Sequence, residues 1–294
     1  MRKPDAASEA RLEAIRRNAT EATVEGHGGS YYGLPLLKPT TWTWEVPAYF
    51  FVGGAAGAAA VIGFAGRISG ADSRLVREAR WIAAIGGALS APLLIADLGR
   101  PERFLNMLRV FKPKSPMSVG AWTLVAFGAS SAIATLPMED RRSRLSGQAG
   151  LPVLHWVSDS AGAASALTGL VMMTYTGVLL GVTVIPVWTK HAGILPIHFA
   201  ASSLGSAAAL LELRGHRQLA VRRIATTAAV IETVMDAAIE QPNVTARIGS
   251  AFAGPIPLAL QLLFGRSRKA RQAAAVSALL GSLLTRIAWV EAGS

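Results

Sequence analysis

Eight long apolar runs are the feature of this sequence that most constrains its fold. A hydrocarbon core about 30 Å thick is crossed by roughly 20 apolar residues in a helix, and a helix in lipid satisfies its own backbone hydrogen bonds. The runs therefore predict an all-α integral membrane protein, a bundle of eight transmembrane helices. They cover residues 45–68, 79–98, 117–137, 159–183, 191–213, 222–240, 247–265 and 271–290.

The composition agrees with a membrane location. Only 16% of the residues are charged, against about 25% in an average soluble domain. Alanine, glycine and serine dominate several runs, and Gly53 and Gly57 form a face suited to close helix contact in lipid. Residues 1–30 are polar and lack the apolar stretch of a cleavable signal peptide. We therefore expect a flexible polar tail over residues 1–30 and one domain over residues 31–294 in the inner (cytoplasmic) membrane.

The formal net charge of +11 reflects basic residues that stand mostly between the apolar runs. This pattern is typical of membrane-flanking charge, so no nucleic-acid partner is expected. Arginine is abundant in the first, third, fifth and seventh loops, which places them in the cytoplasm and both termini outside. The second loop departs from this rule, and a docked protein partner would explain its five basic residues, Arg100, Arg103, Arg109, Lys112 and Lys114.

The residue types also limit which cofactors the chain could hold by itself. It has no cysteine, so it lacks disulfides and the usual ligands of an iron–sulfur cluster. A bis-histidine haem needs two imidazoles that face each other inside the bundle, and the five histidines offer no such pair. We therefore expect no haem, no iron–sulfur cluster and no metal site in this chain.

Several segments carry a specific resemblance. They are Tyr31–Pro35, Trp42–Gly54, Asp97–Trp122, Tyr175–Leu180 and Ile185–Trp188. Together they resemble the NrfD-like family of polysulfide-reductase membrane subunits. The matching motifs cover about residues 31–190, whereas residues 191–294 match only in hydropathy.

The resemblance implies a quinone-reactive subunit that is inert alone. Members of the family have eight helices and no haem, anchor an iron–sulfur subunit, and exchange electrons through it with a molybdopterin catalytic subunit. Tyr175 matches the family's quinone-facing tyrosine, and Tyr49 matches a quinone-contacting position that is histidine in the best-known member. Val46 departs from a neighbouring amide, for which Glu45 would substitute. Asp97 begins the loop that docks the iron–sulfur subunit.

The same residues make physical sense as a quinone site. Glu45 and Tyr49 are four residues apart and share one helix face. Because successive helices alternate in direction, Asp97 at the end of the second run and Tyr175 near the end of the fourth return to the same membrane edge. Plainer explanations exist for each residue: interfacial tyrosines form aromatic belts, Glu45 would stabilise a helix N-terminus, and Asp97 would pair with arginines of the second loop.

Carboxylates inside membrane helices are costly and are usually paired or functional. Glu232, Asp236 and Glu240 recur every four residues in the sixth run and so form one stripe. Arg286 lies late in the eighth run at the depth expected for Asp236, which predicts an Asp236–Arg286 pair. Glu232 would then remain as a functional carboxylate that exchanges protons. Ion pairing between helices would explain the stripe equally well.

Three functions remain open at this point. The chain is a quinone-reactive redox subunit, a passive anchor without quinone chemistry, or a secondary transporter or ion channel. Transporters often have broken helices around a site at the membrane midplane. The motifs here gather at one edge and in one loop instead, which favours the redox subunit. The catalytic partner's substrate, the quinone type and the direction of electron flow are left open.

Overall fold

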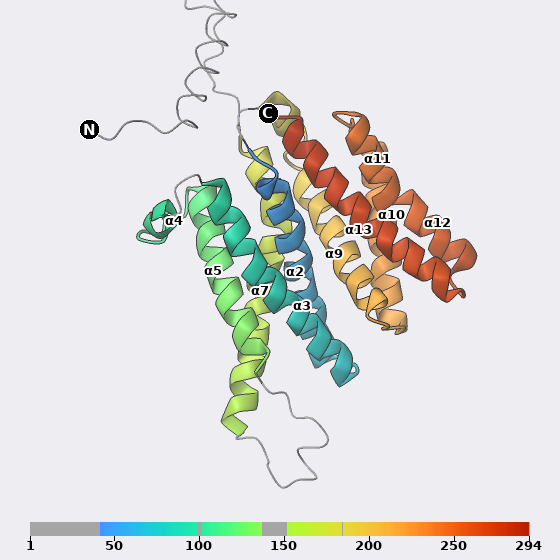
Figure 1. Ribbon diagram of the computed structural model, residues 1–294, viewed down its shortest axis with the longest axis horizontal. Coiled ribbons are helices and arrows are strands. Elements are labelled where there is room, and N and C mark those ends of the chain that lie inside the picture. The colour runs from blue at the N-terminus through green and yellow to red at the C-terminus, as the bar shows by residue number, and fades with distance from the viewer. Residues whose placement is uncertain (1–41, 99–101, 137–151, 184, 294) are drawn as a thin grey trace, which may run out of the picture. The chain divides into compact units, whose positions relative to one another are not determined.

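The computed structural model describes residues 42–98, 102–136, 152–183 and 185–293. The tail expected over residues 1–30 lies outside them. Within these ranges every regular element is a helix, and the long helices run up and down in alternation (Figure 1). They are α2 (Glu45–Ile68), α3 (Ser73–Asp97), α4 (Glu102–Met107), α5 (Pro116–Ala134), α7 (Pro152–Gly181), α8 (Pro186–Thr189), α9 (Leu195–Leu213), α10 (Leu219–Ala238), α11 (Val244–Ala253), α12 (Pro255–Phe264) and α13 (Arg268–Glu291).

The long helices form two groups. In the first, α2 packs against α3 and α7, and α5 packs against the same two helices. In the second, α13 packs against α9, α11 and α12, and α10 also contacts these three. The groups meet along α2 and α9, which contact each other, while α7 also contacts α9 and α13 also contacts α2 (Figure 1).

Six stretches of the described chain are long and apolar enough to cross a membrane, with α11 and α12 counted as one stretch. The other two predicted spans exist as the helices α9 and α10, but they are more polar. His198 and Glu212 lie in α9, and α10 carries two arginines and two acidic residues. Over the described residues the structure is therefore all-helical with six candidate spans, and it does not establish the count of eight.

Local sequence signals explain where the helix boundaries differ from expectation. The predicted span 79–98 begins earlier, at Ser73, because the Asp72 carboxylate accepts a hydrogen bond from the Arg74 amide (3.1 Å) and caps the helix. The predicted span 247–265 is broken at Gly254 into α11 and α12. Pro255 follows this glycine directly and has no amide hydrogen to continue the α11 ladder.

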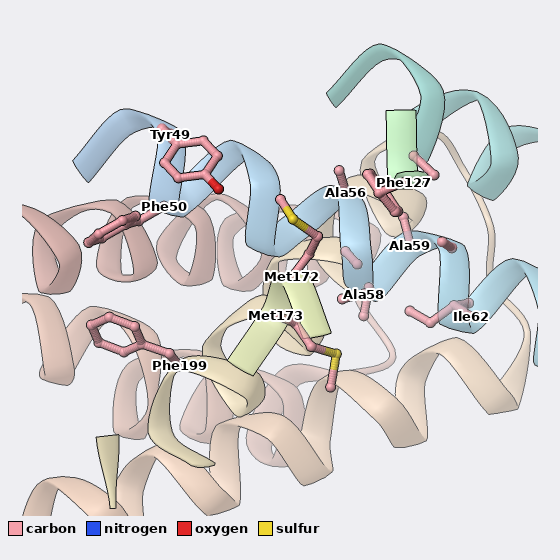
Figure 2. Packing of buried hydrophobic residues seen from close by; sticks show 14 of the residues in the cluster. Tyr49, Phe50, Ala56, Ala58, Ala59, Ile62, Phe127, Met172, Met173 and Phe199 are labelled. Atoms are coloured by element: carbon pink, nitrogen blue, oxygen red, sulfur yellow. The ribbon is translucent and has the colours of Figure 1, made fainter. Parts of the chain in front are cut away.

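Small residues allow α2 and α7 to touch through their backbones. A Cβ atom added at Gly57 would lie 2.5 Å from the carbonyl oxygen of Gly169, and one added at Gly169 would lie 2.6 Å from that of Gly57. The predicted small-residue face at Gly57 is therefore confirmed. Beside it, the Met172 side chain of α7 lies against α2 near the buried Ala56 (Figure 2). Such packing favours helix association in lipid, where burial of apolar surface gives little driving force.

Ion pairs tie the helices together at one end of the bundle. We call this end, where α2 and α9 end and α3, α10 and α13 begin, the arginine edge. The Arg80 side chain is only 4% exposed and donates to Asp159 Oδ1 (2.9 Å), Ser158 Oγ (2.9 Å) and the Ala134 carbonyl (3.1 Å). Arg67 pairs with the other Asp159 oxygen at 2.8 Å. One carboxylate thus joins α2, α3 and α7 at this edge.

Candidate functional site

A largely apolar pocket opens at the opposite end of the bundle, which we call the pocket edge. Its empty volume is about 540 Å³, counted with its open mouth. Residues of α2, α3, α4, α5 and α7 line it. The predicted residues Tyr49, Asp97 and Tyr175 supply polar groups to its wall. The structure therefore brings together three of the four groups that the sequence placed at one membrane edge.

Tyr49 comes to the pocket from the second turn of α2. Its side chain is 2% exposed. Its hydroxyl is buried and has no hydrogen-bond partner within the part of the chain that the structure describes. A buried polar atom without a partner is uncommon in folded proteins and calls for a physical explanation. A ligand oxygen in the pocket would supply one.

Tyr175 reaches the same pocket from the end of α7. It is 8% exposed. Its ring lies directly over Gly120 of α5, where an added Cβ atom would fall 2.3 Å from the tyrosine hydroxyl oxygen. Any residue larger than glycine at position 120 would displace the phenol. The absence of a side chain at Gly120 therefore creates the space in which Tyr175 faces the pocket.

Asp97 is the last residue of α3 and lines the pocket. Its Oδ1 atom accepts hydrogen bonds from the Thr43 hydroxyl (3.0 Å) and the Thr43 amide (3.4 Å). These bonds hold the start of α2 against the end of α3. The predicted pairing of Asp97 with Arg100 or Arg103 involves side chains outside the described part of the chain.

Glu45 occupies the first position of α2 at the same edge, but it does not line the pocket. Its Oε2 atom is buried and has no hydrogen-bond partner among the described residues. Val46, where the family resemblance expects an amide, does line the pocket and adds apolar surface. The sequence analysis placed both Glu45 and Asp97 at this edge. Of the two carboxylates, Asp97 is the one that lines the pocket.

Trp42 closes one side of the pocket and connects it to the second helix group. Its ring stacks on the ring of Trp188, with centroids 5.1 Å apart and planes 18° from parallel. Trp188 is fully buried, and its indole N–H donates to the carbonyl oxygen of Trp289 in α13 (2.7 Å). This chain of contacts fixes the tryptophan that forms the pocket wall.

The second loop lies beside the pocket and is exposed. Met107, at the end of α4, lines the pocket. The predicted partner-binding residues Arg109, Lys112 and Lys114 are all exposed to solvent. Apolar side chains between and near them are exposed as well: Leu105 by 70%, Val110 by 57% and Phe111 by 53%. Arg100 and the side chain of Arg103 lie outside the described residues.

A second polar site lies inside the other helix group. Arg286 of α13 is fully buried and donates to Ser202 Oγ (3.0 Å), Ser203 Oγ (2.9 Å), and the carbonyl oxygens of Ser282 (2.9 Å) and Phe199 (3.3 Å). Neutral oxygens of α9 and α13 thus accept hydrogen bonds from both terminal nitrogens of the guanidinium, whereas its Nε atom has no partner among the described residues. The sequence analysis missed this arrangement. The sequence signal that could have indicated this arrangement was the serines within the two apolar segments, Ser202 and Ser203 in α9 and Ser282 in α13.

The predicted Asp236–Arg286 pair is wrong. Asp236 Oδ1 instead accepts a hydrogen bond from the Gln241 amide nitrogen (2.9 Å), and it forms no ion pair with any described residue. Glu232, one turn away, is the carboxylate that faces the interior, with only 1% of its surface exposed. Depth along a helix can be counted from the sequence, but the rotation of the helix decides which residue of a stripe faces inward.

Glu232 has an unexpected neighbour in α9. Both side chains are fully buried, and His198 Nε2 lies 3.7 Å from Glu232 Oε2. Neither group forms a hydrogen bond with the rest of the described chain. A narrow cavity is lined by Glu232, Ser202 and Gln261 and, toward the arginine edge, by Glu212. The predicted functional carboxylate, Glu232, therefore borders a cavity. No cluster of possible metal ligands occurs among the described residues.

Comparison with known proteins places the chain in a family. No curated protein matches it. The family described as "Polysulphide reductase, NrfD" matches residues 36–292, nearly the whole chain. This range includes the second helix group, whose residues resembled the family only in hydropathy in the sequence analysis. The chain therefore belongs to the NrfD family of polysulphide reductase membrane subunits.

Proposed function

We propose that this protein binds quinone or quinol in the largely apolar pocket that Tyr49, Asp97 and Tyr175 line, and that it exchanges electrons with an iron–sulfur subunit. Membership in the NrfD family implies a membrane subunit of a quinone-linked oxidoreductase complex. The observation that carries the proposal further is the Tyr49 hydroxyl, which lies on the wall of a largely apolar pocket and has no hydrogen-bond partner among the described residues. We further propose that the iron–sulfur subunit links this chain to a molybdopterin catalytic subunit.

The pocket has the chemical features that quinone binding requires. Quinone reduction takes up two electrons and two protons and forms quinol. Apolar side chains such as Phe50, Leu94 and Leu179 offer a surface for the isoprenoid tail. The hydroxyls of Tyr49 and Tyr175 are suited to donate hydrogen bonds to ring oxygens, and Asp97 is a carboxylate that can accept and release a proton.

The exposed second loop is suited to hold the electron-transfer partner. Basic residues at an interface rim steer an acidic partner and set the salt dependence of binding, while exposed aromatic and aliphatic residues supply buried anchors. Arg109, Lys112 and Lys114 provide the charge, and Leu105 and Phe111 provide the apolar surface. Since α4 also borders the pocket through Met107, a partner bound here would place its cluster close to the quinone.

Glu232 is proposed to exchange protons on the other side of α2. A Cβ atom at Gly54 of this helix would lie 3.2 Å from the Arg286 guanidinium, while Tyr49 of the same helix lines the pocket. Helix α2 thus contacts both the polar cluster around Arg286 and the pocket. Glu232 and Glu212 line one narrow cavity, and protons would approach Glu232 from its Glu212 side.

The test is purification of the chain with its partners, followed by quinol-dependent electron transfer. We expect an iron–sulfur and a molybdopterin subunit to co-purify and quinol to reduce the clusters. The Tyr49→Phe variant should assemble normally but turn over quinol more slowly. Co-purification without quinol-dependent reduction would instead indicate a passive anchor, and the absence of both partners would favour the transporter interpretation.

A further inference from the structure

A second pocket, rich in arginine, lies at the arginine edge. Its empty volume is about 540 Å³. It is formed where α9 gives way to α10 and where α12 gives way to α13. We call it the arginine pocket because four arginines line it. They are Arg217, Arg222, Arg266 and Arg271.

The charges of this pocket are only partly neutralised. Arg271 has a carboxylate partner, because its Nε atom lies 2.9 Å from Glu212 Oε1. Arg217, Arg222 and Arg266 form no ion pair with any residue that the structure describes. Three guanidinium groups around one cavity therefore present an excess of positive charge, which attracts an anion.

The pocket arginines are partly positioned by backbone contacts. Arg271 Nη1 donates to the Gly265 carbonyl (2.9 Å), and Arg222 Nη2 donates to the Gln261 carbonyl (3.5 Å). A Cβ atom at Gly265 would lie 2.7 Å from Arg222 Nη2, so the guanidinium passes directly over this glycine. These contacts hold two of the four side chains in place before any ligand binds.

A helix N-terminus adds to the positive field. Gln218, the N-cap residue of the 20-residue helix α10, lines the pocket and makes no side-chain capping hydrogen bond. The first amide groups of a helix have no partner within the helix, and they favour an anion. The pocket therefore offers both guanidinium and amide donors.

An apolar surface borders the arginine pocket. The last turn of α12, directly before Gly265 and Arg266, exposes three large side chains: Leu262 by 68%, Leu263 by 73% and Phe264 by 58%. In a membrane protein such residues at a helix end face acyl chains. A phosphate-binding group and a lipid-facing surface thus stand side by side.

We propose that the arginine pocket binds a phosphate-bearing anion, with the headgroup of an anionic phospholipid as its source. Arginine binds phosphate oxygens through paired N–H groups, and basic pockets between transmembrane helices are suited to anionic headgroups. The acyl chains would lie along Leu262 and Leu263. This site lies across the bundle from the pocket at the pocket edge and does not depend on quinone chemistry.

The test compares two pairs of arginine variants. The pocket pair is Arg217→Gln with Arg266→Gln. The control pair is Arg223→Gln with Arg268→Gln, which removes the same charge from exposed residues of the same edge that do not line the pocket. Each full-length chain is purified, and phospholipid retained in detergent is measured by native mass spectrometry. The thermal unfolding midpoint is then measured in phosphatidylcholine nanodiscs with and without phosphatidylglycerol.

We expect phosphatidylglycerol to raise the unfolding midpoint of the wild type and of the control pair but not of the pocket pair. Retained anionic lipid should fall at least tenfold in the pocket pair, since the loss of a single charge-assisted contact already accounts for about tenfold. Equal loss in both pairs would overturn the proposal, because it would show attraction to general surface charge. Inorganic phosphate is added in a separate measurement, and equal stabilisation by phosphate alone would overturn the lipid as the source.

If the pocket pair fails to fold, Arg217→Lys with Arg266→Lys replaces it. This pair keeps the charge but loses the paired N–H geometry of arginine. We expect this pair to retain less anionic lipid than the wild type and the control pair. Retention equal to that of the wild type would overturn a role for guanidinium recognition.

Discussion

Adding one methyl group at Gly120 tests whether the pocket wall positions Tyr175 for quinone. An alanine Cβ atom there would lie 2.3 Å from the Tyr175 hydroxyl oxygen and 2.3 Å from its Cζ atom, whereas an ordinary contact begins at 3.4 Å. The phenol must therefore move by about 1 Å. Both overlapping atoms belong to one rigid ring, so the movement displaces the hydroxyl itself.

The expected consequence follows from the size of this displacement. Misplacing a group by 1 Å in a reacting site costs up to about 100-fold in rate, and overpacking a well-packed region costs about 1–3 kcal/mol of stability. We therefore expect Gly120→Ala to assemble with its partners but to show a strong loss of quinol turnover with a raised KM. The assay is steady-state quinol oxidation or quinone reduction by the purified complex, with assembly followed by gel filtration.

Gly128→Ala is the matched control on the same helix. A Cβ atom at Gly128 meets no atom within 4 Å, so the added methyl group displaces nothing. We expect this variant to match the wild type in assembly and in kinetics. Unchanged kcat and KM in Gly120→Ala would refute the reasoning, because they would show that quinone turnover does not depend on the position of Tyr175.

Three further variants test the remaining assignments. Tyr175→Phe keeps the ring and removes the hydroxyl, and loss of a hydrogen bond worth about 0.5–1.5 kcal/mol should slow quinol turnover several-fold in the steady-state assay. Glu232→Gln should leave folding intact, as judged by thermal unfolding, and slow proton-coupled turnover; full activity would contradict its role. Replacing Arg109, Lys112 and Lys114 by alanine should release the iron–sulfur subunit at lower salt in gel filtration, and an unchanged salt dependence would contradict docking at this loop.

Alternation of helix direction made the edges of the bundle predictable from the sequence. Tyr49 near the start of α2, Asp97 at the end of α3 and Tyr175 near the end of α7 had to meet at one end if the helices run up and down. The structure confirms that all three line one pocket. Counting residues along a helix locates a side chain in depth, and this is the information on which the prediction relied.

Rotation about the helix axis was not predictable in the same way. Glu45 lies at the correct depth but does not line the pocket, and Asp236 was expected to face the bundle interior, where the buried Glu232 lies instead. A stripe of residues four apart turns gradually around the helix, and only contacts with neighbouring helices fix which member faces inward. The serines that satisfy Arg286 belong to both α9 and α13, so no pattern within a single segment identifies them as a group.

The way Arg286 is satisfied bears on what Glu232 is free to do. A buried arginine that relied on a carboxylate would leave that carboxylate a structural role, since removing either partner would strand a charge. Here the hydrogen bonds of Arg286 go to serine hydroxyls and backbone carbonyls, whereas both oxygens of Glu232 lack a hydrogen-bond partner among the described residues. Among the described residues, His198 is the one group within ion-pairing distance of Glu232, and Glu232 lines a narrow cavity together with Glu212. A buried carboxylate whose oxygens form no hydrogen bond with the described residues, and that lines a cavity, is suited to take up and release a proton.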